Sequence, residues 1–173
     1  SALFTILSLC LSLSLYASEG RATLINRGGG LIYDTDLNIT WLQDANYAKT
    51  SGYDDDGRMT WLQAINWAAE LSYGGYNDWR LPTATVLNYN YGYDGTTGAG
   101  YNNTNSEMGH IFYIELGNRA YYDSNGIAQP GCGLINTGAF TNIQTSYEYW
   151  SGTGWAYAYG AWGFGFFSGF QYG

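Results

Sequence analysis

Residues 155–173 read WAYAYGAWGFGFFSGFQYG, and aromatic rings alternate there with glycine, alanine or serine. Successive side chains of a β-strand point to opposite faces of a sheet, so a period of two residues predicts β-structure. The rings keep this period in two runs, 155–159 and 162–166, and the phase changes between them. Each predicted strand therefore has one face of rings and one nearly bare face.

Two interpretations of these rings stay open. Aromatic side chains most often pack into a core, and they also form exposed contact surfaces. An unpaired strand of this composition would be prone to aggregation. We therefore expect either that a closing strand beyond Gly173 covers the edge, or that the edge serves assembly into larger structures.

Upstream of this β-rich third, the sequence predicts one clear helix. Thr60 and Gln63 have the three-residue spacing of a capping box. Apolar residues then recur at helical spacing as far as Leu71, and Gly74 and Gly75 end the helix.

The other predicted elements are short. Two strands on either side of a glycine turn are predicted over 23–25 and 31–33, with a further turn at 34–36. A second helix is predicted over 108–116 and a short strand over 140–144.

The composition is that of one globular domain with an acidic surface. The chain has 173 residues, of which 46% are hydrophobic, and its formal net charge is -8. Neutralising phosphates requires clustered Lys and Arg, and the chain has six scattered ones. Nucleic acid is therefore not an expected partner, and anionic membranes and sulfated polysaccharides are disfavoured.

Residues 1–18 carry no charge and have a leucine-rich centre, followed by small residues near Ala17. This pattern is typical of a secretory signal peptide whose start is missing; a buried or membrane-anchoring helix is the alternative. We therefore expect a secreted or cell-surface protein with a single domain over 19–173 and no stable membrane span after processing. Cys132 would then be the only cysteine left, so no internal disulfide is expected.

Catalytic and cofactor chemistry are not expected. His110 is the sole histidine, and neither a nucleophile elbow nor a zinc signature surrounds it. Cys132 has no basic neighbour in sequence that would activate its thiol. The acidic run 54–56 could supply oxygen ligands to calcium, but it lacks the twelve-residue loop with a final bidentate Glu, and a solvated loop before the helix explains it equally well. The prediction is no cofactor, with calcium as the open alternative.

The segment 87–105 is predicted to be a long surface loop rich in Tyr, Asn, Gly and Thr. Tyr offers rigid amphipathic surface and Asn adaptable hydrogen bonding, which suits recognition of a sugar or a protein surface. An ordinary polar loop is the alternative. The candidate ligand-binding residues are Tyr89, Tyr91, Tyr93, Tyr101, Asn102 and Asn103, and Trp155, Tyr157 and Tyr159 would extend their surface.

Three groups of residues carry a family resemblance. They are GLIYD at 30–34 with TW at 40–41, GRMTW at 57–61 with DWRLPT at 78–83, and YWSGT at 149–153. In this order, and over about residues 24–173, they resemble the Lcl C-terminal domain family of exported bacterial proteins.

The resemblance implies an α+β protein of C-type lectin-like fold, in which two helices pack on a small mixed or antiparallel sheet beside a long irregular loop region. It also implies a surface or secreted recognition module, and in some members polysaccharide binding. The Glu-Pro-Asn and Trp-Asn-Asp triplets by which calcium-dependent lectins hold a sugar are absent from this chain. Arg80 is expected to pair with a carboxylate inside the fold.

Our interpretation of the sequence is a non-catalytic recognition or adhesion domain that binds an extracellular glycan or protein. The alternative is a structural protein that self-assembles, as a homo-oligomer, fibre or matrix, through its Gly/aromatic C-terminal strands. An enzyme related to the sulfatase-modifying factors, which share the scaffold, is the least favoured because His and paired Cys are scarce.

Overall fold

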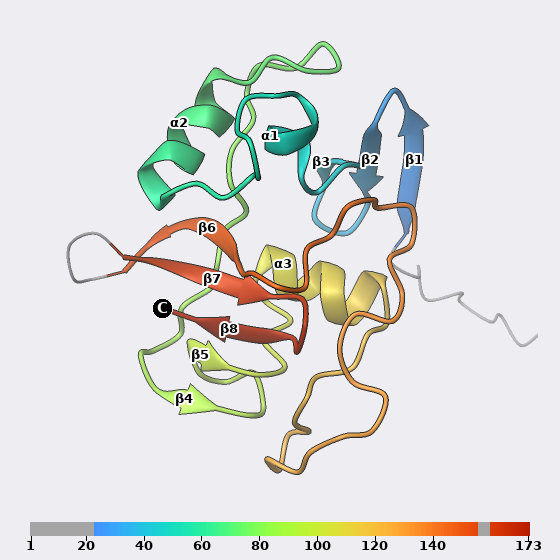
Figure 1. The fold of residues 1–173 in the computed structure, drawn as a ribbon. Coiled ribbons are helices and arrows are strands. Elements are labelled where there is room, and N and C mark those ends of the chain that lie inside the picture. Colours follow the sequence, from blue (N-terminus) through green and yellow to red (C-terminus); the bar gives the residue numbers. More distant parts are fainter. Residues whose placement is uncertain (1–22, 156–159) are drawn as a thin grey trace, which may run out of the picture.

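In the computed structural model, which describes residues 23–155 and 160–173, the strands form two separate sheets (Figure 1). The N-terminal sheet is an antiparallel meander of β1 (Leu24–Gly28), β2 (Leu31–Asp34) and β3 (Ile39–Leu42). The first two strands and the turns beside them confirm the sequence prediction for this region.

The second sheet, called the tail sheet here, has the strand order β4-β5-β8-β7-β6. Its strands are β4 (Tyr91–Gly92), β5 (Ala99–Gly100), β6 (Tyr149–Gly154), β7 (Ala161–Gly165) and β8 (Phe170–Tyr172). Strands β4 and β5 run parallel, and the other neighbours run antiparallel. The last strand, β8, therefore lies inside the sheet, with a partner on each side.

The aromatic rings of β7 belong to the core. Every residue of this strand is buried, and Trp162 and Phe164 are only 1% and 0% exposed. The bare face is closed as well, because a Cβ built on Gly163 would lie 2.5 Å from the hydroxyl oxygen of Tyr172 on the next strand. Core packing is thus the correct interpretation for these rings.

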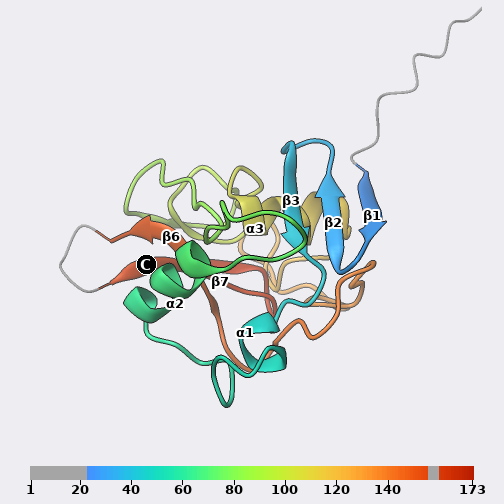
Figure 2. The same ribbon diagram turned by 90° about the horizontal axis from the view of Figure 1, so that it is seen from above.

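Helices are few. They are α1 (Tyr47–Thr50), α2 (Trp61–Glu70) and α3 (Glu107–His110), and α3 continues directly into a π-helix, η1 (Ile111–Glu115). Helix α2 begins with the predicted capping box, in which the Thr60 hydroxyl accepts from the Gln63 N–H and the Gln63 side chain accepts from the Thr60 N–H. Figure 2 shows α2 above the tail sheet, where the indole N–H of Trp61 donates to the carbonyl of Ser151 at 2.9 Å.

One hydrophobic core joins the two sheets. Ile32 of β2, Phe112 of η1 and Phe164 of β7 are all fully buried in the same cluster. Helices α3 and η1 run between the N-terminal sheet and the tail sheet (Figure 1). The central helix therefore carries side chains that both sheets pack against.

The structure corrects the sequence prediction in places. The strand expected over 140–144 does not form, because Asn142 has a φ of 56° and interrupts the extended backbone, which leaves an isolated bridge between Thr141 and Asp44. The helix expected over 108–116 is present, with a widened second half. The mixed α and β architecture is confirmed, with two sheets in place of one. The predicted signal peptide, 1–18, lies outside the described residues.

Candidate functional site

Rings from three distant segments meet on one side of the tail sheet and form a continuous aromatic surface, which we call the tyrosine ridge. The rings of Tyr93 and Tyr101 are stacked, with centroids 6.2 Å apart and planes 2° from parallel. The ring of Phe170 lies 5.1 Å from that of Tyr101 and joins the loop to β8. The ridge consists of Tyr91, Tyr93, Tyr101, Tyr121, Tyr122, Phe170 and Tyr172.

The ridge is exposed at two of its tyrosines. Tyr91 is 51% and Tyr121 is 39% exposed, while the rings between them are half-buried. The candidate residues predicted from the sequence include the tyrosines of the 87–105 loop and do not include Tyr121 and Tyr122. Adjacent tyrosines beyond the next helix were the only signal that could have indicated them.

The two candidate asparagines form hydrogen bonds to the backbone of the segments that carry the ridge. The side-chain amide of Asn102 donates to the carbonyls of Tyr93, at 2.6 Å, and Tyr122, at 3.2 Å. Asn103 is buried, and its amide donates to the carbonyl of Gly100. These contacts tie the two tyrosine segments together. A ligand-binding role for either asparagine stays a prediction.

The polar groups of the ridge are the hydroxyl groups of its tyrosines. Burial raises the pKa of Tyr101, and it raises the pKa of Tyr172 to about 12, with a further contribution from the charge of Glu148. Neutral hydroxyl groups both donate and accept hydrogen bonds. The ridge therefore offers flat apolar faces with polar tips and no charge of its own.

A second group of rings lies at the C-terminal hairpin. The ring of Trp155 is 5.4 Å from that of Tyr89 and 4.8 Å from that of buried Trp162. Tyr89 is 59% exposed. The structure thus brings two of the candidate residues together here, and the candidates Tyr157 and Tyr159 lie outside the described residues.

A cleft of about 1090 Å³ opens between the α1–α2 region and the tail sheet, and sequence reasoning did not find it. Its aromatic walls come from segments far apart in the chain, including Trp41, Trp67, Trp79, Tyr147 and Trp150. Arg80 lines this cleft and forms a bidentate pair with Glu107, at 2.7 and 2.8 Å. The predicted pairing of Arg80 with a carboxylate is confirmed.

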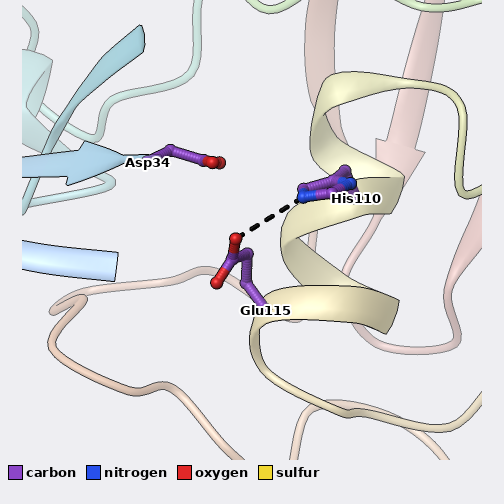
Figure 3. Close-up of side chains that lie close together, drawn as sticks. All are labelled: Asp34, His110 and Glu115. Carbon is purple, nitrogen blue, oxygen red and sulfur yellow. Dashed lines mark ion pairs between the residues drawn. The ribbon is translucent and has the colours of Figure 1, made fainter. Parts of the chain in front are cut away.

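A cluster of ionisable side chains lies between the N-terminal sheet and the central helix. Figure 3 shows Asp34 of β2 facing His110 and Glu115. The Nε2 atom of His110 is 3.5 Å from Glu115 Oε1 and 3.7 Å from Asp36 Oδ2. Burial, followed by the charge of Asp34, raises the pKa of Glu115. The sequence around His110 contains neither a nucleophile elbow nor a zinc signature, and Asp34 and Asp36 lie far from it in the chain.

The acidic run 54–56 forms a tight loop. One carboxylate oxygen of Asp54 accepts hydrogen bonds from the backbone N–H groups of Asp56, Gly57 and Arg58, and these bonds lower the pKa of Asp54. The loop is thus organised around Asp54 itself. Calcium binding there stays the open alternative to the prediction of no cofactor.

The fold and its surface define a small domain of mixed α and β structure with an exposed aromatic face. Comparison with protein families matches residues 30–173 to the Lcl C-terminal domain. Since this match spans most of the chain, the protein belongs to the Lcl C-terminal domain family, and membership suggests a surface or adhesion-type domain. Neither curated proteins nor solved structures gave a match.

Across residues 23–155 and 160–173, the helices are all too short or too polar to cross a bilayer.

Proposed function

We propose that the protein is an exported, non-catalytic recognition domain that binds a neutral glycan along the tyrosine ridge. The observation that carries this proposal is the continuous run of rings between Tyr91 and Tyr121, both of which are exposed. Flat rings stack on the C–H faces of sugars, and neutral phenol groups hydrogen-bond to sugar hydroxyls. The net charge of -8 favours an uncharged glycan over a sulfated one.

The proposed scaffold is a C-type lectin-like fold, as the family resemblance implies. A few short helices, two sheets and long loops support this proposal. Recognition through rings needs no calcium, which agrees with the absence of the calcium-lectin triplets from the sequence. Export is proposed from the apolar, uncharged residues 1–18.

Three tyrosine variants test the proposal against a panel of neutral polysaccharides. Tyr91→Ala and Tyr121→Ala should each weaken binding about tenfold, since one ring contact contributes about 1 kcal/mol beyond its area. Tyr147→Ala is the matched control, because this tyrosine is equally exposed but lies in the cleft. Affinity electrophoresis in polysaccharide gels or calorimetry measures the change.

The control also separates the ridge from the cleft. Binding that is lost in Tyr147→Ala and kept in both ridge variants would move the site to the cleft. If no neutral glycan binds and the same ridge captures a protein ligand, the ligand of the domain is a protein surface and not a glycan.

The alternative of self-assembly through the C-terminal strands has less support. Strand β8 is hydrogen-bonded to β5 and β7, so its backbone groups are already paired within the molecule. Assembly would have to use β4 or β6, the outer strands of the tail sheet. Sedimentation velocity over a hundredfold range of concentration distinguishes a monomer from a growing polymer.

A further inference from the structure

We propose that Asp34, His110 and Glu115 form a binding site for a divalent transition-metal ion of the zinc type, which links the N-terminal sheet to the central helix. The inference does not depend on the glycan proposal, since the cluster contains no residue of the tyrosine ridge. It departs from the expectation, drawn from the sequence, that the chain binds no metal.

Two buried atoms of the cluster lack partners. Among the residues that the structure describes, neither His110 Nε2 nor Glu115 Oε1 has a hydrogen-bond partner, although both are buried. The side chain of Glu115 is only 2% exposed. The two atoms are 3.5 Å apart, beyond the usual length of an N–H···O hydrogen bond, of up to about 3.2 Å. An unpartnered buried carboxylate oxygen is costly, and a cation between the two atoms would satisfy both.

The charges of the cluster also favour a cation. Glu115, Asp34 and Asp36 bring three carboxylates to one imidazole, with Asp36 Oδ2 3.7 Å from His110 Nε2. Even a protonated His110 would leave an excess of negative charge beside the core. A neutral imidazole, the carboxylates of Asp34 and Glu115 and one divalent ion are balanced, and the carboxylate of Asp36 is partly exposed to solvent.

The distance between His110 and Glu115 suits a small ion with mixed nitrogen and oxygen ligands, and Asp34 is the nearby third ligand. One ligand atom from each of Asp34, His110 and Glu115 lies within 4.8 Å of the other two. Tetrahedral ligands at about 2.0–2.1 Å from zinc are about 3.4 Å from one another, close to the observed 3.5 Å between His110 and Glu115. Calcium instead takes six to eight oxygen ligands, and imidazole favours zinc and its neighbours. Asp36, which is partly exposed, or water can complete the coordination.

The carboxylate of Asp34 is already oriented for this role. Its Oδ1 accepts from the N–H groups of Asp36 and Leu37, each at 3.0 Å. From the residues that the structure describes, its Oδ2 accepts one long bond, of 3.3 Å, from the indole N–H of Trp41, so a lone pair is left for a metal ion. Such outer contacts fix the direction of a metal ligand and are part of the site.

The π-helix explains how two ligands come from one helix. Residues 110 and 115 are five apart, which in an α-helix of about 3.6 residues per turn would place them on different faces. The N–H of Leu116 instead bonds to the carbonyl of Ile111, the i→i+5 pattern of a π-helix. This wider turn brings Glu115 beneath His110. Single π-turns occur frequently at functional sites.

Zinc titration of the chelator-treated protein tests the proposal. Calorimetry should show one zinc ion per chain, and Glu115→Gln and His110→Gln should each weaken its affinity about 100-fold or more, because each removes a direct ligand. Trp41→Phe should weaken it about tenfold through loss of the bond to Asp34. Glu70→Gln, an exposed carboxylate at the end of α2, is the matched control and should bind as the parent does.

A second readout does not depend on the variants. In ¹H–¹⁵N spectra of the unaltered protein, the indole N–H signal of Trp41, assigned through Trp41→Phe, should move on addition of zinc and stay in place on addition of calcium. No heat of binding, full zinc affinity in folded Glu115→Gln or His110→Gln, or a preference for calcium would each overturn the proposal.

Discussion

Glu107 joins two segments through a single carboxylate group. It accepts from both terminal nitrogens of the Arg80 guanidinium and, at 2.7 Å, from the N–H of Thr83. Burial by itself would raise its pKa, but these hydrogen bonds outweigh it and the pKa is lowered. We expect Glu107→Gln to lower the free energy of unfolding by about 1–2 kcal/mol at pH 7, a moderate value because Arg80 is half exposed. Urea denaturation measures it.

The pH dependence of this effect has a definite sign. A carboxyl group whose pKa is lowered by folding stabilises the protein above its unfolded pKa, near 4.5, and loses that contribution as the pH falls through its folded pKa. The difference between the parent and Glu107→Gln should therefore narrow below about pH 4.5. A constant difference from pH 7 to pH 3 would contradict the assignment.

Substitution of Gly109 tests how closely α3 packs against the 87–105 loop. In an exposed helix, glycine to alanine gains about 1 kcal/mol. Here a Cβ would lie 1.9 Å from the backbone oxygen of Asn103, so helix and loop would have to separate. We expect Gly109→Ala to destabilise the protein by about 1–3 kcal/mol in thermal or urea unfolding. Gly152→Ala, whose Cβ would meet nothing nearer than 3.4 Å, should be close to neutral. A stabilised Gly109→Ala would refute this packing.

At the scale of elements, α2 is short enough to depend on its cap. A helix of ten residues is marginal alone, and its first N–H groups need partners. Thr60→Ala removes one half of the capping box and should cost about 1 kcal/mol. Asn66→Ala on the exposed side of the same helix should cost less, as alanine has the higher helix propensity. Circular dichroism during urea unfolding compares the two, and equal stabilities of parent and Thr60→Ala would be the contrary result.

Elements whose signal is local were predictable from the sequence. The capping box and apolar stripe of α2 and the alternating rings of β7 each lie within a dozen residues. The two-residue strands β4 and β5 carry no such signal, since Gly, Tyr and Asn there are equally typical of a loop. They form because the amide of Gln171 on β8 donates to the carbonyls of Gly98 and Thr85 and fixes the loop against the sheet.

The candidate sites likewise divide into residues that a local sequence signal indicates and residues that only the fold brings together. Tyrosines of the 87–105 loop were visible in the sequence as a group, whereas Tyr121 and Phe170 join them only through the fold. The cluster of Asp34, His110 and Glu115 could not be predicted from the sequence, for two reasons. Its members are far apart in the chain, and the π-turn that aligns two of them departs from the helical period used to interpret the sequence.

At the scale of the whole molecule, the two sheets depend on one another because they share a core around η1. Ile32 lies on the N-terminal sheet, yet it is fully buried in the cluster that includes Phe112 of η1 and Phe164 of the tail sheet. Hydrogen bonds also connect the tail sheet to the segment before α2, such as the bond from the indole N–H of Trp150 to the carbonyl of Met59, at 2.9 Å. Unfolding of one sheet therefore exposes the core face of the other.

Ile32→Ala tests this coupling. Truncation leaves a cavity in a site that neighbouring rings cannot fill, so we expect a loss of about 2–5 kcal/mol. Because a shared core unfolds as one unit, the loss should appear equally in far-UV circular dichroism and in tryptophan fluorescence. The fluorescence is dominated by rings outside the N-terminal sheet, such as Trp150 and Trp162. Ile25→Ala, on the exposed side of β1, serves as the control and should change little. Two separated transitions, with the tryptophan signal unaffected by Ile32→Ala, would mean that the tail sheet folds without the N-terminal sheet.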